Sequence, residues 1–174
     1  MFGMKNFIQL SIITAIGILL IGCKSQSVKN ETFSEQQIVV ESDNQSIKAK
    51  LIAEAKTWIG TPYKYGHAQK GEGADCSGFI MTIVDDVAGI KLPRNSAKQS
   101  EFCMEIKRTD LKPCDLVFFA TGKNLQKISH VGMMIDDDNF IHASSSKGVV
   151  ISKLSSNYYT SRLIKCCRIS NLSN

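Results

Sequence analysis

The sequence predicts an α+β domain in which helices come first and an antiparallel sheet follows. In the first half of the domain, apolar residues recur at three- and four-residue spacing, as they do along one face of a helix. After residue 114 the pattern changes to short runs rich in β-branched and aromatic residues, separated by short polar segments of hairpin type. A chain of 174 residues, 43% hydrophobic and 21% charged, suits one globular domain. Helices followed by strands indicate helices packed on one sheet.

The first 22 residues predict an export signal. Lys5 gives the segment a positive start, and the apolar run SIITAIGILLIG is too short to span a bilayer comfortably as a helix. The run ends in LIGC, which resembles the bacterial lipobox, where a lipidated cysteine becomes the mature N-terminus. A plain signal peptide or a signal anchor with an incidental cysteine is the alternative. We expect a lipid on Cys23 and a cell-envelope location, periplasmic or on the outer membrane.

Residues 23–45 predict a flexible tether between this anchor and a folded domain over 46–174. The segment is rich in Ser, Asn, Gln and Glu and contains one short apolar island. The chain carries a formal net charge of +5, but no block of Lys and Arg with interleaved aromatic residues occurs in it. We therefore expect no nucleic-acid partner.

Three helices are expected before the strands. Ser46 can cap the first, and its apolar face precedes a stop at Gly60. Asp75 can accept hydrogen bonds from the first amides of a second helix, which ends at Gly89. A third, shorter helix is expected within LPRNSAKQSEF. The strands that follow are expected in the runs DLVFFA, HVGMMID, NFIHAS, GVVISKL and RLIKCCRI.

Cys76 lies in the first turn of the second helix and is a candidate nucleophile. A thiol attacks as its thiolate, and the unpaired amides and dipole of a helix N-terminus are expected to lower its pKa. The chain has three histidines to serve as a base. His130 and His142 fall on neighbouring predicted strands, so one can contact the thiol while the other orients the first. Structural or surface histidines are the alternative.

Several segments between Gly60 and Ile169 together resemble the NlpC/P60 family of cysteine peptidases. They are GTPYKYG, DCSGF, LPRNSAKQ, CDLVFF, SHVGMMI, FIHAS and a closing GVVISKL with YY and CCRI, in the order that the family shows. The resemblance implies a papain-like fold whose N-terminal helices pack on an antiparallel sheet. It implies hydrolysis of peptidoglycan stem peptides, often between D-isoglutamate and the dibasic third residue, with no cofactor.

Matching positions give roles to individual residues. The resemblance implies that Cys76 is the nucleophile, His130 the general base and acid, and His142 the residue that orients His130. Tyr63 would correspond to the tyrosine that assists at the oxyanion or the substrate, and Tyr65 is the less favoured choice.

The resemblance also suggests a substrate pocket next to the nucleophile. Asp75 would recognise the free amine of a stem peptide, Ser77 would act beside it, and Arg94 would pair with a substrate carboxylate. The alternatives are that Asp75 caps the helix, that Ser77 fills the helix start and that Arg94 is solvated. Two positions depart from the family, because His67 and Cys114 stand where glycine is usual. His67 would narrow the cleft or lie on the surface.

Four further cysteines, Cys103, Cys114, Cys166 and Cys167, can oxidise in an exported chain and allow three full pairings. Adjacent strand residues point to opposite faces, so Cys166 and Cys167 should not pair with each other and one of them should face inward. A zinc site is a competing idea, but the chain has neither a CxxC nor an HxxxH spacing, and we expect no metal.

We therefore expect a cell-wall endopeptidase anchored to a membrane, with muropeptides as its substrates. Two other functions remain open on the same fold: a catalytically idle module that binds muropeptides, and an acyltransferase or amidase. The sequence leaves open which stem-peptide bond is cut and whether the chain forms oligomers.

Overall fold

A computed structural model of the chain describes residues 46–172. The predicted signal over 1–22, the lipidation site Cys23 and the tether over 23–45 lie outside these residues. Within the described part, no helix is both long and apolar enough to cross a membrane.

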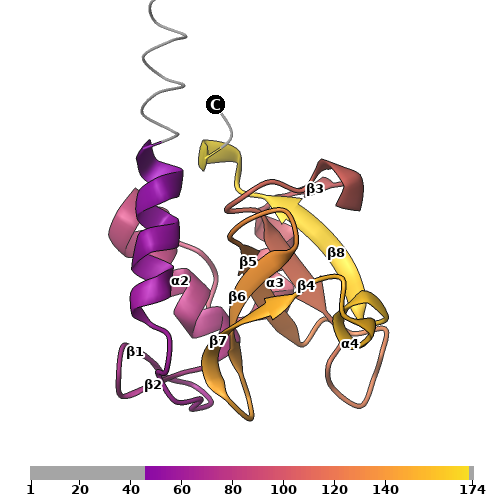
Figure 1. Cartoon of the computed structure of the whole chain (residues 1–174), viewed down its shortest axis with the longest axis horizontal. Helices are drawn as coiled ribbons and strands as arrows, with labels where there is room; N and C mark the ends of the chain where they lie inside the picture. Colours follow the sequence, from indigo (N-terminus) through magenta and orange to yellow (C-terminus); the bar gives the residue numbers. More distant parts are fainter. Residues whose placement is uncertain (1–45, 173–174) are drawn as a thin grey trace, which may run out of the picture. The chain divides into compact units, whose positions relative to one another are not determined.

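Three helices precede the sheet, as the sequence predicts. The first covers residues 46–57 and is followed by a turn through Gly60, whose φ is +90°. The second and third are α2 (Cys76–Ala88) and α3 (Ser96–Phe102). The first helix and α2 lie side by side next to the sheet (Figure 1).

Helix α2 has the capping residues that the sequence predicts. The Asp75 carboxylate accepts a hydrogen bond of 2.8 Å from the amide of Gly78 in the first turn. At the other end Gly89 adopts the left-handed conformation and its amide donates to the Asp85 carbonyl. The face that α2 turns inward is fully buried at four apolar positions: Phe79, Ile80, Ile83 and Val84. These contacts fix the start of α2, where the candidate nucleophile lies.

Six strands form one sheet in which every neighbouring pair is antiparallel. In spatial order they are β3 (Met104–Ile106), β8 (Leu163–Arg168), β4 (Leu116–Phe119), β5 (His130–Met134), β6 (Asn139–Ser144) and β7 (Gly148–Lys153). Five of them correspond to the five predicted runs. The sixth, β3, is a short exposed edge strand that the sequence did not indicate.

Several small elements complete the described part. A two-stranded hairpin of β1 (Ala68–Gln69) and β2 (Gly73–Ala74) precedes α2, and α4 (Asn157–Thr160) joins β7 to β8. Two short 3-10 turns cover Arg108–Asp110 and Ser170–Leu172.

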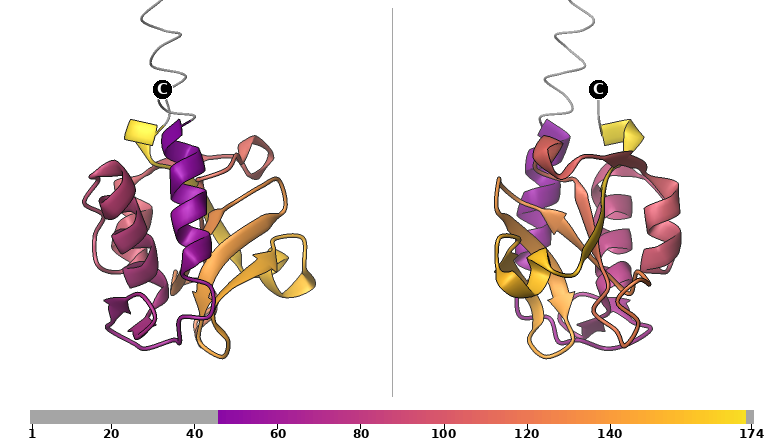
Figure 2. Two further views of the ribbon diagram at one scale, coloured as in Figure 1. Left: turned by 60° about the vertical axis from the view of Figure 1, so that its left-hand side comes forward. Right: turned by 90° about the vertical axis from the view of Figure 1, so that its right-hand side faces the viewer.

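Both faces of the sheet carry buried apolar side chains. The helices lie against one face of the sheet (Figure 2). The larger cluster joins them to that face and includes Phe79 of α2 and Phe118 of β4. A smaller cluster on the other face includes Val117, Phe119 and Phe140. The helices therefore cover the face of the sheet that carries the larger cluster, and an α+β fold of this kind confirms the fold class that the sequence predicts.

One disulfide links the two layers. Cys103, which ends α3, is bonded to Cys167 of β8, and their Cα atoms lie 5.6 Å apart. Cys114 and Cys166 are buried free thiols, so residues 46–172 hold one bridge where full oxidation of these four cysteines would give two. Cys167 belongs to the larger cluster and Cys166 to the smaller one. The prediction that the two point to opposite faces is confirmed, but the expectation that only one of them faces inward is wrong, because both faces of the sheet are covered and both side chains are buried.

Candidate active site

Cys76 is the first residue of α2 and is buried at the junction of the helix with the sheet. The backbone amides of Val131 and Ser77 lie near enough to its sulfur to lower the pKa of the thiol. Because Val131 directly follows His130 in β5, the thiol lies against the start of the strand that begins with the predicted base. The packing of α2 on the sheet thus brings the start of the helix close to the start of β5.

His130 and His142 contact each other, as predicted. Nε2 of His130 lies 2.9 Å from Nδ1 of His142, and both side chains are buried. The strands allow this because β5 and β6 are antiparallel neighbours. Gly132 lies two residues after His130 on β5 and leaves room for the ring of Phe140. A Cβ at this position would lie 2.5 Å from Phe140 Cδ2. Phe140 in turn stacks on the His142 ring.

Burial keeps the reactive groups neutral. It lowers the pKa of His130 to about 4. It also lowers the pKa of His142 to about 3, with a further contribution from the charge of His130. Burial raises the pKa of the Cys76 thiol to about 11, although the amides of Val131, Ser77 and Cys76 oppose this rise. The expectation that the helix N-terminus would lower the thiol pKa is therefore wrong, because loss of hydration outweighs the amides.

Neutral rings restrict which nitrogen can act as the base. Nε2 of His130 faces His142, so Nδ1 is the ring nitrogen left to accept the proton of the thiol. His142 is the hydrogen-bond partner of His130 on the side away from Nδ1, and as a neutral ring it adds no negative charge to the site.

Tyr63 lies on the side of the site that carries Cys76. Its backbone pairs with Ala74, next to the N-cap of α2, and its side chain is half-buried. Burial raises the pKa of the Tyr63 hydroxyl, and nearby negative charge on Cys76 and Asp75 raises it further. Tyr65 is 88% exposed. Tyr63 is therefore the more enclosed of the two tyrosines and interacts electrostatically with Cys76, while its assisting role stays a prediction.

Asp75, Ser77 and Arg94 form one hydrogen-bonded cluster. The two Nη atoms of Arg94 donate to the two carboxylate oxygens of Asp75, each at 2.8 Å. Arg94 also donates to the Ser77 hydroxyl at 3.1 Å, and that hydroxyl donates to Asp75 at 3.1 Å. The amide of Gly66 completes the set at 2.8 Å.

This cluster settles two of the alternatives that the sequence left open. Asp75 caps the helix, and five protein donors satisfy its oxygens. Burial alone would raise the pKa of Asp75, but hydrogen bonds from Arg94, Gly78 and Gly66 outweigh burial and lower it. Arg94 is paired, and its side chain remains 41% exposed. Ser77 and Arg94 therefore offer polar groups beside the nucleophile, whereas Asp75 mainly holds them.

The two departures from the family pattern lie outside the histidine pair. His67 is exposed, and its backbone carbonyl accepts hydrogen bonds from the Asp75 amide at 3.0 Å and from Arg94 at 3.3 Å. Cys114 is buried with a φ of +72°, a conformation that glycine adopts without strain. Its thiol donates to the carbonyl of Lys48 at 3.4 Å, which ties the first helix to the start of β4.

Sequence reasoning missed three residues around the site. Ser152 of β7 and Tyr159 of α4 both contact Nε2 of His142, at 3.0 and 3.1 Å. Gln99 of α3 is fully buried and donates to the carbonyls of Ser77 and Pro93. Two of the three are hydroxyl-bearing residues of common types, and their partners depend on strand register and on helix packing, which no motif in the sequence displays.

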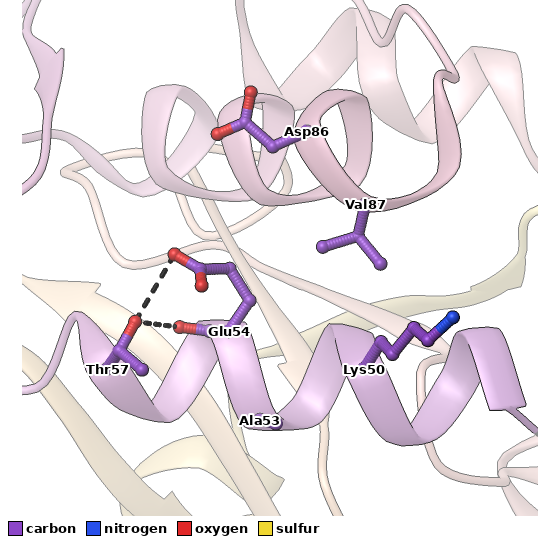
Figure 3. Close-up of a pocket in the computed structure, with 6 residues that line it drawn as sticks. All are labelled: Lys50, Ala53, Glu54, Thr57, Asp86 and Val87. Atoms are coloured by element: carbon purple, nitrogen blue, oxygen red, sulfur yellow. Dashed lines mark hydrogen bonds between the residues drawn. The ribbon is translucent and has the colours of Figure 1, made fainter.

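A separate groove lies between the first helix and α2. Its lining includes Glu54 and Thr57, which hydrogen bond each other, and Asp86 and Val87 across from them (Figure 3). None of the predicted site residues lines it. Across residues 46–172 no cluster of three or more His, Cys, Asp or Glu side chains could hold a metal ion.

Comparison with known proteins matches this geometry. Residues 60–168 match the profile of the NlpC/P60 family. The chain is similar to the probable endopeptidase NlpC of Escherichia coli K12, with 39% identity over 128 residues, which cover 74% of this chain and 82% of that protein. It is also similar to the murein DD-endopeptidase MepS/murein LD-carboxypeptidase of the same strain, with 31% identity over 170 residues, 89% of this chain and 88% of that protein.

Among solved structures, an NlpC/P60 family protein from Bacillus cereus superposes with a TM-score of 0.65 at 33% identity. The match covers 70% of this chain and 40% of that one, so the chain corresponds to less than half of the solved protein. The matched family profile, residues 60–168, extends across the helix and the strands that hold Cys76, His130 and His142. On these grounds the chain belongs to the NlpC/P60 family.

Proposed function

We propose that this chain is a cell-wall peptidoglycan endopeptidase that hydrolyses stem-peptide amide bonds with Cys76, His130 and His142. The observation that carries the proposal is the buried thiol at the start of α2, which lies against the strand that begins with one member of a hydrogen-bonded histidine pair. Two relatives with endopeptidase names, which align over most of this chain, support the choice of reaction.

The reaction begins with proton transfer from the thiol. As the Cys76 sulfur attacks the scissile carbonyl carbon, its proton moves to Nδ1 of His130 and the carbonyl electrons move to the oxygen. In this proposal the backbone amide of Cys76 and the Tyr63 hydroxyl donate hydrogen bonds to that oxygen. Because the resting thiol and imidazole are both neutral, this transfer accompanies the attack and no ion pair precedes it.

Collapse of the tetrahedral intermediate gives a thioester. The C–N bond breaks, and His130 gives its proton to the leaving amine. Water then attacks the thioester carbonyl and passes a proton to His130. When the C–S bond breaks, that proton returns to the sulfur, which restores the neutral pair and releases the carboxylic acid.

We propose the bond between D-isoglutamate and the dibasic residue as the target. Ser77 directly follows the nucleophile, and its hydroxyl accepts a hydrogen bond from the partly exposed Arg94, so the two can contact the polar ends of a short stem peptide. MepS is named for a DD bond and for carboxypeptidase activity, so a cross-linked substrate is the natural comparison.

We also propose that the domain works in the cell envelope, anchored through a lipid on Cys23 with residues 23–45 as its tether. The expected result is that a radiolabelled or clickable palmitate is incorporated into the full chain and that the chain fractionates with membranes. Cys23→Ala should abolish both. Labelling that persists in Cys23→Ala, or release of wild-type chain in soluble form, would overturn the anchor.

The function is tested with defined muropeptides: a tripeptide, a tetrapeptide and a cross-linked dimer. Wild-type domain should convert the tripeptide into two products whose summed mass exceeds that of the substrate by one water. Cys76→Ala should lose this activity, whereas Cys166→Ala, which removes another buried free thiol, should keep it.

Other outcomes identify other functions. Equal cleavage by wild type and Cys76→Ala would exclude the thiol mechanism. Cleavage of the dimer alone would move the target to the cross-link. Transfer of an acyl group to an added amine would indicate a transferase, and binding without turnover would indicate an idle binding module.

A further inference from the structure

The far nitrogen of His142 is enclosed by two hydroxyl groups that the proposed reaction does not use. Ser152 Oγ lies 3.0 Å from His142 Nε2, and Tyr159 Oη lies 3.1 Å from the same atom. Each nitrogen of His142 thus has its own partner: Nδ1 faces His130, and Nε2 faces the hydroxyl pair.

Both hydroxyls are held in place by the fold. Ser152 and Val150 lie on the same face of β7, and Val150 is directly opposite His142, so Ser152 is its diagonal neighbour. The ring of Tyr159 packs against Phe119 and Phe140, with centroids 5.2 and 4.8 Å away. Neither contact can follow the His142 ring if it turns, so together they define one ring orientation.

The hydroxyl pair also bears on where the protons lie. For His130 to accept the thiol proton on Nδ1, its own proton must be on Nε2, which then donates to Nδ1 of His142. Neutral His142 must in that case carry its proton on Nε2. A hydrogen on Nε2 can be donated to either hydroxyl oxygen, so in this form both nitrogens of His142 have a hydrogen-bond partner.

We propose that Ser152 and Tyr159 are positioning residues that hold His142 in the orientation and the Nε2-protonated form in which it can serve His130. This inference rests on the proposed function, since it concerns the same histidine pair. In the reaction, the positive charge that His130 gains is shared through His142 and ends on two oxygen acceptors. A hydroxyl pair thereby stabilises the charge that a buried carboxylate stabilises in other triads.

The first test reads the protons directly and needs no substrate. The chain has three histidines, so a long-range ¹H–¹⁵N spectrum of the domain at pH 7 resolves each imidazole. We expect His130 and His142 both to carry hydrogen on Nε2, and we expect Tyr159→Phe with Ser152→Ala to shift His142 toward a mixture of forms. Hydrogen on Nδ1 of His142 in the wild type, or an unchanged His142 signal in the double variant, would overturn the proposal.

The second test separates positioning from substrate binding. Tyr159→Phe and Ser152→Ala should each lower kcat roughly tenfold, and together by more, with KM unchanged. Ser152→Thr, which keeps the oxygen, should retain kcat. Tyr158→Phe is the matched control, because in the described part the Tyr158 hydroxyl has no hydrogen-bond partner.

Circular dichroism and an unfolding midpoint establish that each variant is folded. If the double variant does not fold, the two single variants are used for both tests. A rise in KM with constant kcat, or an equal loss in Tyr158→Phe, would contradict a positioning role. If wild-type domain cleaves no muropeptide, the proposed function fails, while the spectra still decide the protonation of His142.

Discussion

At the scale of single residues, burial dominates the chemistry of the site. Cys76, His130 and His142 are all buried, and for each the loss of hydration is the largest influence on the pKa. Their protonation states are therefore those of neutral groups over a broad range around pH 7. Catalysis then depends on how well the proton path is aligned, since no charged pair waits in the resting enzyme.

The acid limb of activity should report the His130 pKa. Below about pH 4 the ring is protonated and cannot accept the thiol proton, so kcat/KM should fall as the pH drops through about 4. An exposed imidazole would lose activity near its ordinary pKa of about 6.5 instead. The measurement is kcat/KM for muropeptide cleavage from pH 3.5 to 8. The control is His67→Gln, a change at an exposed histidine, which should leave the acid limb of the kcat/KM profile where it is. An acid limb centred near pH 6.5 would contradict a buried, neutral His130.

Residue types alone predicted the histidine contact but not its surroundings. Two histidines on consecutive strands meet because antiparallel neighbours bring one face together, which the sequence pattern displays. Ser152 and Tyr159 reach His142 through the register of β7 and the position of α4, which depend on packing. The thiol pKa was predicted in the wrong direction because the depth of burial is a property of the folded chain.

At the scale of elements, the start of α2 is locked to the loop before it. The Asp75 amide donates to the His67 carbonyl at 3.0 Å, and Gly78 lets that same carbonyl approach the helix. A Cβ on Gly78 would lie 2.5 Å from the His67 oxygen and 3.2 Å from Arg94. The glycine of DCSGF is thus required for a close approach of backbone to backbone.

Gly78→Ala should push the His67 loop outward and weaken both the cap and the Arg94 pair. We expect kcat/KM for muropeptide cleavage to fall by at least tenfold. Thermal unfolding should show that the free energy of unfolding falls by roughly 1–3 kcal/mol, which is the usual cost of overpacking a buried site. Gly122→Ala is the matched control, because its nearest contact would be an ordinary 3.5 Å from Ser129 Oγ. Equal kcat/KM and equal unfolding free energy in the two variants would mean that the loop around His67 moves aside without loss of stability or activity.

Long elements with strong periodicity were predicted, and short ones were not. Helix α2 and the five strands from β4 to β8 have several residues of clear pattern each. β3 has three mostly exposed residues, and the β1–β2 hairpin has two residues in each strand. Such short pieces form because neighbouring backbone is already in place to pair with them, so their own residues give little signal.

At the scale of the whole molecule, the disulfide joins the helical layer to the sheet. The bridge between Cys103 and Cys167 has a sequence separation of 64 and encloses every strand from β3 to most of β8. A charged contact runs alongside it, since Lys165 donates to the Ser100 carbonyl at 2.8 Å. The sequence could not choose this pairing, because two full pairings keep Cys166 and Cys167 apart and only the fold decides which sulfurs meet.

Removing the bridge should destabilise the domain without displacing the site. For a closed loop of this length, chain entropy predicts a loss of about 4 kcal/mol for Cys103→Ser with Cys167→Ser. Urea unfolding with and without reductant measures this loss. Reductant should lower the free energy of unfolding of the wild type by a similar amount and leave that of the double variant unchanged. Further weakening of the double variant by reductant would show that another bridge contributes.

The side-by-side placement of Cys166 and Cys167 has a consequence for oxidative folding. In an unformed chain the two sulfurs are equally near any partner, and only the pleat of β8 sends one toward Cys103 and the other toward the opposite apolar cluster. If oxidation precedes strand pairing, some molecules should therefore form a disulfide between Cys103 and Cys166 in place of the native one with Cys167. Such molecules would require thiol exchange before they reached the native isomer.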